Sequence, residues 1–79
     1  MVSNKIVRAQ PSKDYSMEVW FKDGQHGFFS LKPHLETGLF TTLKDRRLFD
    51  AVRVEYGTLA WPGDLDISPD TVESELKIQ

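Results

Sequence analysis

The sequence predicts an α+β fold: a small two-layer domain in which a mostly antiparallel sheet of about five strands packs against a short helix and a C-terminal helix. Three observations support this prediction. Tyr15–Phe21 alternates apolar and polar side chains with the period of a strand. Val52–Trp61 contains two more alternating segments around Tyr56-Gly57, which is typical of a hairpin. Ser68-Pro69 carries the signals that begin a helix.

Length and charge limit the kind of protein. The 79 residues suffice for one domain, residues 1–79, with a single thin core. The chain has no cysteine, which excludes disulfides and cysteine-based zinc or iron–sulfur sites. The formal net charge of −2 does not give the broad basic surface of an unaided nucleic-acid binder. No segment approaches the ~20 apolar residues of a membrane helix, so we expect a cytoplasmic protein without membrane contact.

The N-terminal third is expected to form a strand and a hairpin. Lys5–Gln10 is a short strand candidate, and Pro11–Asp14 forms the turn after it. The hairpin that follows has two possible loops, a two-residue loop at Asp23-Gly24 and a three-residue loop over Lys22–Gly24. The longer loop requires Gly24 in the left-handed conformation, which glycine adopts without strain.

The register of this hairpin decides which aromatic side chains are exposed. The three-residue loop places Met17 opposite Phe29, and a slip of one residue would exchange the two faces of the strands. The match of apolar residues therefore favours the three-residue loop. Trp20, His26 and Phe28 then share the other face, where they need a cover from a helix of the same chain or from a partner.

The middle of the chain predicts little regular structure. Pro33–Leu43 is expected to be irregular or to hold one helical turn, with Gly38 as its stop. Asp45–Asp50 is expected to form a short helix with its first residue as the N-cap. Leu48 and Phe49 are both expected to turn inward.

A second hairpin and a helix complete the fold. A two-residue turn at Tyr56-Gly57 pairs Val54 with Leu59, and Pro62 ends the second strand because it lacks an N–H donor. The turn places four apolar side chains on one face: Val52, Val54, Leu59 and Trp61.

The C-terminal helix has the clearest local signals. Ser68 suits the N-cap, Pro69 suits the first helical position, and Asp70 complements the helix dipole. Val72 and Leu76, one turn apart, form the stripe that is expected to be buried.

Acidic residues form the densest group of ionisable side chains. Asp64, Asp66 and Asp70 could supply oxygen ligands to Mg²⁺ or Ca²⁺. The alternative is a polar turn followed by a helix start, because the longer ligand series and closing Glu of a calcium loop are absent. His26 and His34 are the only histidines, and their spacing matches no metal motif.

The sequence contains no signature of an enzyme. It has no Gly-x-Ser-x-Gly elbow, no glycine-rich phosphate loop and no dinucleotide fingerprint. No catalytic residue and no cofactor are therefore predicted.

Aromatic side chains are the best candidates for binding. Trp20, Phe28 and Trp61, with His26 beside them, suit a protein interface or base stacking. The alternative is that they pack under the C-terminal helix. The local cluster of positive charge is either a solvated helix face or a nucleic-acid contact, and it comprises Lys44, Arg46 and Arg47.

Five short motifs occur in order along nearly the whole chain: Phe21-x-Asp23-Gly24, Leu39-Phe40-x-x-Leu43, Phe49-x-x-Val52-x-Val54, Gly57-x-Leu59-x-Trp61-Pro62, and Asp64/Asp66 up to Pro69. Together they resemble a small bacterial family known as domain of unknown function 2442. The resemblance implies a compact α+β unit without assigned catalytic residues. Some members are joined to a helix-turn-helix domain, and some stand-alone members look like one half of a toxin–antitoxin-like pair. The 79 residues leave no room for a helix-turn-helix, so DNA binding by that analogy is not expected.

The leading functional hypothesis is a non-enzymatic protein-interaction or regulatory module with an antitoxin-like role as one form. It would bind a protein partner or a second copy of itself through Trp20, His26 and Phe28. One alternative is a metal- or small-molecule-binding accessory that uses the acidic turn. The other is a nucleic-acid-associated regulator that uses the basic cluster.

Overall fold

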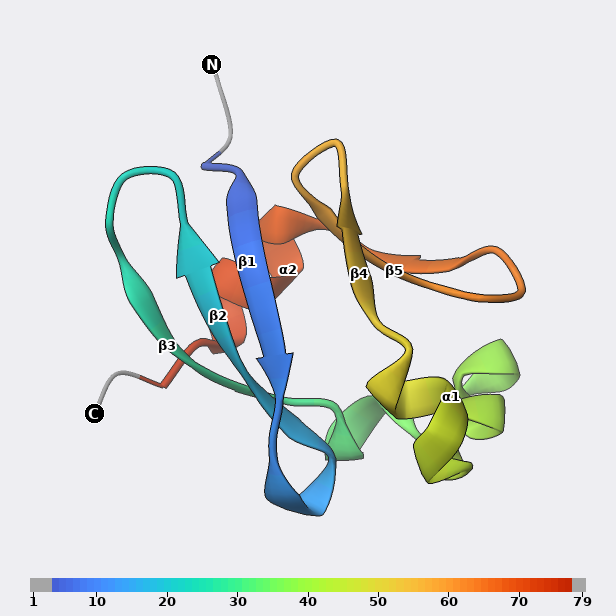
Figure 1. Cartoon of the computed structure of the whole chain (residues 1–79). Coiled ribbons are helices and arrows are strands. Elements are labelled where there is room, and N and C mark those ends of the chain that lie inside the picture. The colour runs from blue at the N-terminus through green and yellow to red at the C-terminus, as the bar shows by residue number, and fades with distance from the viewer. Residues whose placement is uncertain (1–3, 78–79) are drawn as a thin grey trace.

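Two three-stranded antiparallel sheets form the framework of the protein, in the strand orders β1-β2-β3 and β4-β5-β6 (Figure 1). The computed structural model describes residues 4–77. The strands are β1 (Ile6–Pro11), β2 (Ser16–Phe21), β3 (His26–Ser30), β4 (Arg53–Glu55), β5 (Thr58–Trp61) and β6 (Leu65–Ile67). The helices are α1 (Arg46–Asp50) and α2 (Pro69–Glu75), with 3-10 helices η1 (Lys13–Tyr15), η2 (Lys32–His34) and η3 (Gly38–Lys44).

The α+β class is confirmed, and the strands divide between two sheets. The sequence places Leu65–Ile67 in the acidic turn, but this segment is a strand that pairs with β5 and completes the second sheet. Leu65 and Ile67 are buried on its inner side, and Asp66 points outward. Pro62–Asp64 is therefore the tight turn of a third hairpin.

The predicted register of the first hairpin is confirmed. Met17 pairs with Phe29, and the Phe21 N–H donates to the Gln25 carbonyl at 2.8 Å. Gly24 has a φ of 96°, the left-handed conformation that the three-residue loop requires. The inner face of β2 therefore consists of buried apolar side chains, and its polar positions and Trp20 face outward.

The second hairpin also forms as predicted and joins the two sheets. Val54 pairs with Leu59 across a turn in which Tyr56 and Gly57 have φ values of 52° and 79°. The Gly57 carbonyl accepts a hydrogen bond of 3.0 Å from the Ile6 N–H. This bond ties the turn of one sheet to the first strand of the other.

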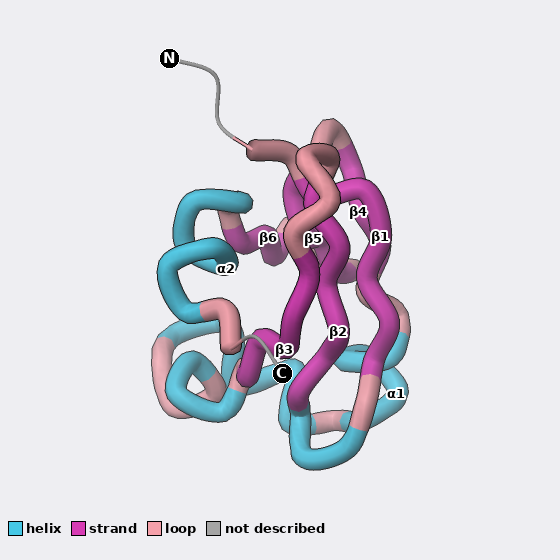
Figure 2. Tube along the Cα trace, turned by 90° about the vertical axis from the view of Figure 1, so that its left-hand side faces the viewer, coloured by secondary structure: helices cyan, strands magenta, loops and turns pink. Residues whose placement is uncertain are grey.

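The core lies between the sheets and α2, which covers one face of β1-β2-β3 (Figure 2). The Val72 side chain of α2 is completely buried, as predicted. After α2 the chain reaches the edge of β3, where Lys77 and Phe28 exchange two backbone hydrogen bonds of 2.8 Å. The largest fully buried side chains are Trp61, Phe29, Phe49, Ile6, Met17, Leu31, Leu43, Leu59, Val19 and Val72.

The helix starts follow the sequence signals, with two corrections. The side chains of Asp45 and Ser68 cap α1 and α2, as predicted. Leu48 is 37% exposed, so the expectation that it turns inward is wrong. Neighbouring positions on a helix lie about 100° apart, and on this short helix only Phe49 faces the core. Gly38, predicted as a stop, instead begins η3 with a φ of 52°.

Candidate functional site

The face of β1-β2-β3 that lies opposite α2, which we call the outer face, carries the predicted binding aromatics. It turns toward the viewer in Figure 1, with α2 behind the sheet. Met17, Val19 and Phe21 of β2 point into the core, so the intervening residues of the strand point outward. Trp20 and Phe28 are half-buried, and His26 is exposed.

Three side chains from three strands stack across the outer face. The register aligns Arg8 of β1 with Trp20 of β2, and Trp20 with His26 of β3. The guanidinium carbon of Arg8 lies 4.7 Å from the centroid of the Trp20 ring. The His26 ring lies on the other side of Trp20 with a centroid distance of 6.4 Å and an interplanar angle of 20°. We call Arg8, Trp20 and His26 the three-strand stack.

The next row of the outer face adds a carboxylate and a second aromatic ring. Glu18 pairs with Phe28 across β2 and β3. An oxygen of Glu18 lies 3.6 Å from Nδ1 of His26. The face thus combines an apolar platform with charges of both signs.

Trp61, predicted as a binding residue, is a core residue. Its side chain has no exposed surface, and its Nε1–H donates to the Phe49 carbonyl at 3.1 Å. The Phe40 ring packs edge-on against it with a centroid distance of 6.4 Å. The alternation of β5 places Trp61 and Leu59 on the same inward face, so Trp61 is not accessible to a ligand.

The three predicted metal ligands do not form a site. Within residues 4–77, no group of three or more His, Cys, Asp or Glu side chains is arranged to hold a metal ion. Asp64 lies in the β5–β6 turn with a φ of 62°, Asp66 lies on the exposed side of β6, and Asp70 lies in the first turn of α2. The alternative interpretation, a turn and a helix start, describes Asp64 and Asp70, whereas Asp66 belongs to a strand.

The cations proposed for nucleic-acid contact are each matched by a carboxylate. Their pairs have N–O distances of 2.9 to 3.1 Å and comprise Lys44 with Glu36, Arg46 with Asp50, and Arg47 with Asp45. These carboxylates reduce the local positive field that phosphate binding would require. No contact among the described residues therefore favours the nucleic-acid alternative.

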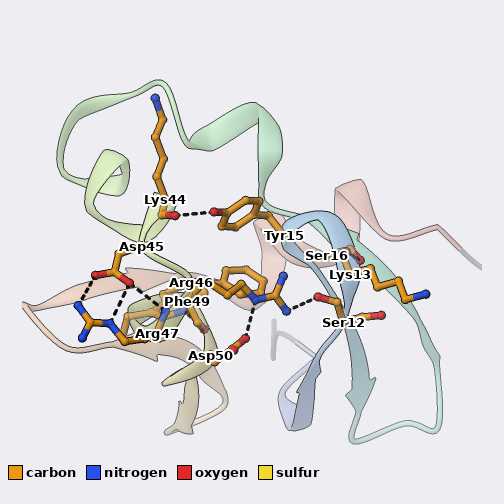
Figure 3. Close-up of polar contacts among 11 residues, drawn as sticks. Ser12, Lys13, Tyr15, Ser16, Lys44, Asp45, Arg46, Arg47, Phe49 and Asp50 are labelled. Atoms are coloured by element: carbon orange, nitrogen blue, oxygen red, sulfur yellow. Dashed lines mark hydrogen bonds and ion pairs between the residues drawn. The ribbon is translucent and has the colours of Figure 1, made fainter.

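Arg46 links the connection between β1 and β2 to the helix α1 (Figure 3). Its guanidinium carbon lies 4.7 Å from the centroid of the Phe49 ring and 5.6 Å from that of Tyr15. The same guanidinium donates to the Ser12 carbonyl, and the Tyr15 hydroxyl donates to the Lys44 carbonyl. These contacts attach the β1–β2 connection to α1.

We expect Asp45, the N-cap residue of α1, to make the stability of the fold depend on pH in the acidic range. The Arg47 side chain, followed by the Arg47 N–H, holds the pKa of Asp45 below its ordinary value of 3.8. The stabilisation is therefore complete above that value and is lost as the pH falls toward the lowered pKa of the folded state. Asp45→Asn removes the titration but can retain the cap. We expect the difference in melting temperature between the wild type and this variant to shrink from pH 7 to pH 2.5.

Melting followed by circular dichroism checks this expectation. Asp23, whose pKa is also lowered, chiefly by the Gln25 N–H, still titrates in the variant and leaves part of the acid dependence in place. The same difference in melting temperature at every pH would contradict the assigned role of Asp45.

His34 links η2 to α2 through a contact at the surface. Its Nε2 lies 3.0 Å from an oxygen of Glu75, and its ring packs beside Phe29 and Phe40. Since its partners belong to the fold, His34 joins two elements and does not belong to the outer face.

A family model described as "Protein of unknown function (DUF2442)" matches residues 6–77. The chain belongs to this family. The DUF2442 match runs from β1 to Lys77 and so includes both sheets and both helices. Neither the curated proteins nor the solved structures contain a significant match to the chain. Within residues 4–77 of this DUF2442 domain, no helix is long and apolar enough to cross a membrane.

Sequence reasoning missed Arg8, the third member of the three-strand stack. The signal was available in principle, because a charged residue in a strand next to Trp20 can be placed by register. A bulge between Ile6 and Arg8 shifts that register, and bulges are not visible in the alternation of a short strand. In this DUF2442 domain the bulge also leaves Val7 56% exposed.

Proposed function

We propose that the protein is a non-enzymatic protein-interaction or regulatory module whose partner binds the outer face. The observation that carries the proposal is the three-strand stack of Arg8, Trp20 and His26. Trp and Arg are enriched among the residues that dominate the binding energy of protein interfaces. Trp buries a large rigid ring with a polar N–H, and the planar guanidinium of Arg stacks on aromatic rings while it donates hydrogen bonds. A partner that covers Trp20 would supply the burial that the fold does not give it.

The rigidity of the platform supports the same proposal. Each member of the stack belongs to a different strand of one sheet. The pairing of the strands therefore fixes the backbone positions of all three residues before a partner arrives. Binding then costs little side-chain entropy. A regulatory subunit of the antitoxin-like kind is one form that we propose for this module, with a protein as the regulated partner.

Trp20→Ala is expected to abolish partner binding while the variant remains folded. The ring is half-buried, so its removal loses roughly 100 Å² of apolar burial, worth about 2 kcal/mol, besides a cation–π contact with Arg8 of about 0.5–1 kcal/mol. We therefore expect a cost of about 2–3 kcal/mol in the free energy of unfolding, below that of a fully buried Trp. The measurement is purification of the tagged protein from its native host, with the mass of the complex and the bound proteins identified for the wild type and the variant.

Leu39→Ala is the matched control, because Leu39 is an exposed apolar residue (70%) of η3 and not of the outer face. It should retain the partner that Trp20→Ala loses. Equal binding by the wild type and Trp20→Ala would overturn the proposal. So would a Trp20→Ala variant that is already unfolded without denaturant, or a wild type that purifies as a monomer without a partner.

A further inference from the structure

The free edge of β3 has an available pair of backbone groups. Leu31 donates its N–H to the Tyr15 carbonyl at 2.8 Å, which directs odd-numbered positions of this strand toward β2. Phe28 directs its N–H and carbonyl the opposite way, where Lys77 binds both. Ser30, two residues further, shares the orientation of Phe28. Within residues 4–77 its N–H and carbonyl have no protein partner.

The edge is uncovered at Ser30 because the residue that would pair with it still belongs to the helix α2. An antiparallel strand that pairs Lys77 with Phe28 would bring Glu75 to Ser30, but Glu75 is the last residue of α2. A groove of about 540 Å³ opens there between the end of β3 and the end of α2. This volume lies within the range of about 300–1,000 Å³ for ligand pockets in proteins. The groove is lined by Ser30, Lys32, Pro33, Ser74, Glu75, Leu76 and Lys77.

The charges of the groove favour an anion. Glu75, its only acidic residue, is already bound to His34 at 3.0 Å. Lys32 is 59% exposed and has only a distant contact, 3.9 Å, with the largely exposed Asp14. Lys77 has no ion pair among the described residues. Leu76 and Pro33 supply apolar surface beside the two lysines.

We propose that the β3 edge groove binds an extended acidic segment of the partner protein, which adds to β3 as a short strand. The segment pairs its backbone with the Ser30 N–H and carbonyl, places an apolar side chain near Leu76, and offers a carboxylate to Lys32. Strand addition of this kind obtains affinity from main-chain hydrogen bonds and specificity from alternate side chains. The proposal rests on the interaction function proposed above and names the chemistry of the partner.

The probe is a random heptapeptide library selected against the full chain, followed by synthesis of the enriched peptides. We expect them to share an Asp or Glu near an apolar residue. A scan that methylates one peptide nitrogen at a time should weaken binding most at a single position, because Ser30, the one described β3 residue that lines the groove, offers a single carbonyl, which accepts one peptide N–H. Methylation of the two neighbouring nitrogens, which a strand directs away from β3, should have little effect. This test needs no change in the protein.

Two pairs of protein variants locate the site. Ser30→Pro removes the outward N–H, a change that edge strands tolerate, and should weaken peptide binding at least about tenfold. Ser30→Ala removes only the hydroxyl and should bind within about twofold of the wild type. Lys32→Gln should weaken binding, whereas Lys22→Gln, in the exposed β2–β3 turn, should not.

Every contrary outcome overturns the proposal. These outcomes are a selection without enriched peptides, enriched peptides that lack carboxylates, a methylation scan in which no single position stands out, and unchanged binding by a folded Ser30→Pro variant. Trp20→Ala separates the two proposals, because the short peptides should still bind this variant. If the peptides bind and the Trp20→Ala variant still retains the natural partner, the β3 edge groove is a binding site and the proposed function of the outer face is wrong.

Discussion

Trp61→Ala is expected to unfold a large fraction of the protein at 25 °C. Replacement of a buried Trp by Ala costs about 3–5 kcal/mol, because the lost contacts and the remaining cavity both destabilise the folded state. The Nε1–H of Trp61 also donates to Phe49, so the change removes a buried hydrogen bond. A domain of this size has a stability near the low end of ~5–15 kcal/mol, and little would remain.

The measurement is urea denaturation followed by far-ultraviolet circular dichroism, which does not depend on which Trp is present. Trp61→Phe is the control, since it retains much of the apolar volume and loses only the indole N–H and part of the ring. We expect it to remain folded with an intermediate stability. A loss of less than about 1 kcal/mol in Trp61→Ala, well below the cost of removing a buried Trp, would show that the indole is not a core residue.

Gly27→Ala is expected to detach the segment that crosses the edge of β3. A Cβ atom at this position would lie 2.6 Å from the Lys77 carbonyl oxygen and 3.0 Å from the Leu76 Cγ. Since the oxygen belongs to the backbone, the conflict cannot be relieved by a side-chain rotation. We expect a loss of about 1–3 kcal/mol, typical of overpacking, and faster hydrogen exchange at the Phe28 and Lys77 amides.

A truncated chain that ends at Glu75 tests the cause of this loss. Without Leu76 and Lys77, the same substitution no longer meets an obstacle. It should then be neutral or stabilising by about 0.4–1 kcal/mol, because Ala restricts the unfolded chain. The sign of the effect should therefore reverse between the two backgrounds. An equal loss of stability in the full and the truncated chain would show that β3 itself requires glycine at position 27, independently of Leu76 and Lys77.

Local sequence signals were sufficient for the hairpins and the helix caps. The register around Gly24 followed from the match between Met17 and Phe29, because only one register places both on the same face. The capping role of Ser68 followed from side-chain chemistry within four residues. The strand β6 did not follow, because alternation over its three residues is too short to recognise. The separation into two sheets did not follow either, because no local pattern specifies which hairpins share a sheet.

The candidate site could be predicted in part. The register of the first hairpin placed Trp20, His26 and Phe28 on one face, and the alternation of the second hairpin placed Trp61 with other apolar residues. Which of these faces is covered depends on where α2 and the other sheet pack, and no local pattern specifies that. The pairing of Arg46 with Asp50 neutralises its charge, and its contact with Ser12 joins residues 34 positions apart, which only the folded chain shows.

The pairing of Lys77 with Phe28 has a consequence for synthesis of the protein. A ribosome produces the chain from the N-terminus, so β1-β2-β3 can assemble while its third strand still has an uncovered edge. The edge is covered only after Lys77 has left the exit tunnel, 49 residues after Phe28. During that interval the nascent sheet presents the backbone N–H and carbonyl of Phe28 unpaired to other chains. A partner or a chaperone at the ribosome would then find a longer free edge of β3 than in the complete fold.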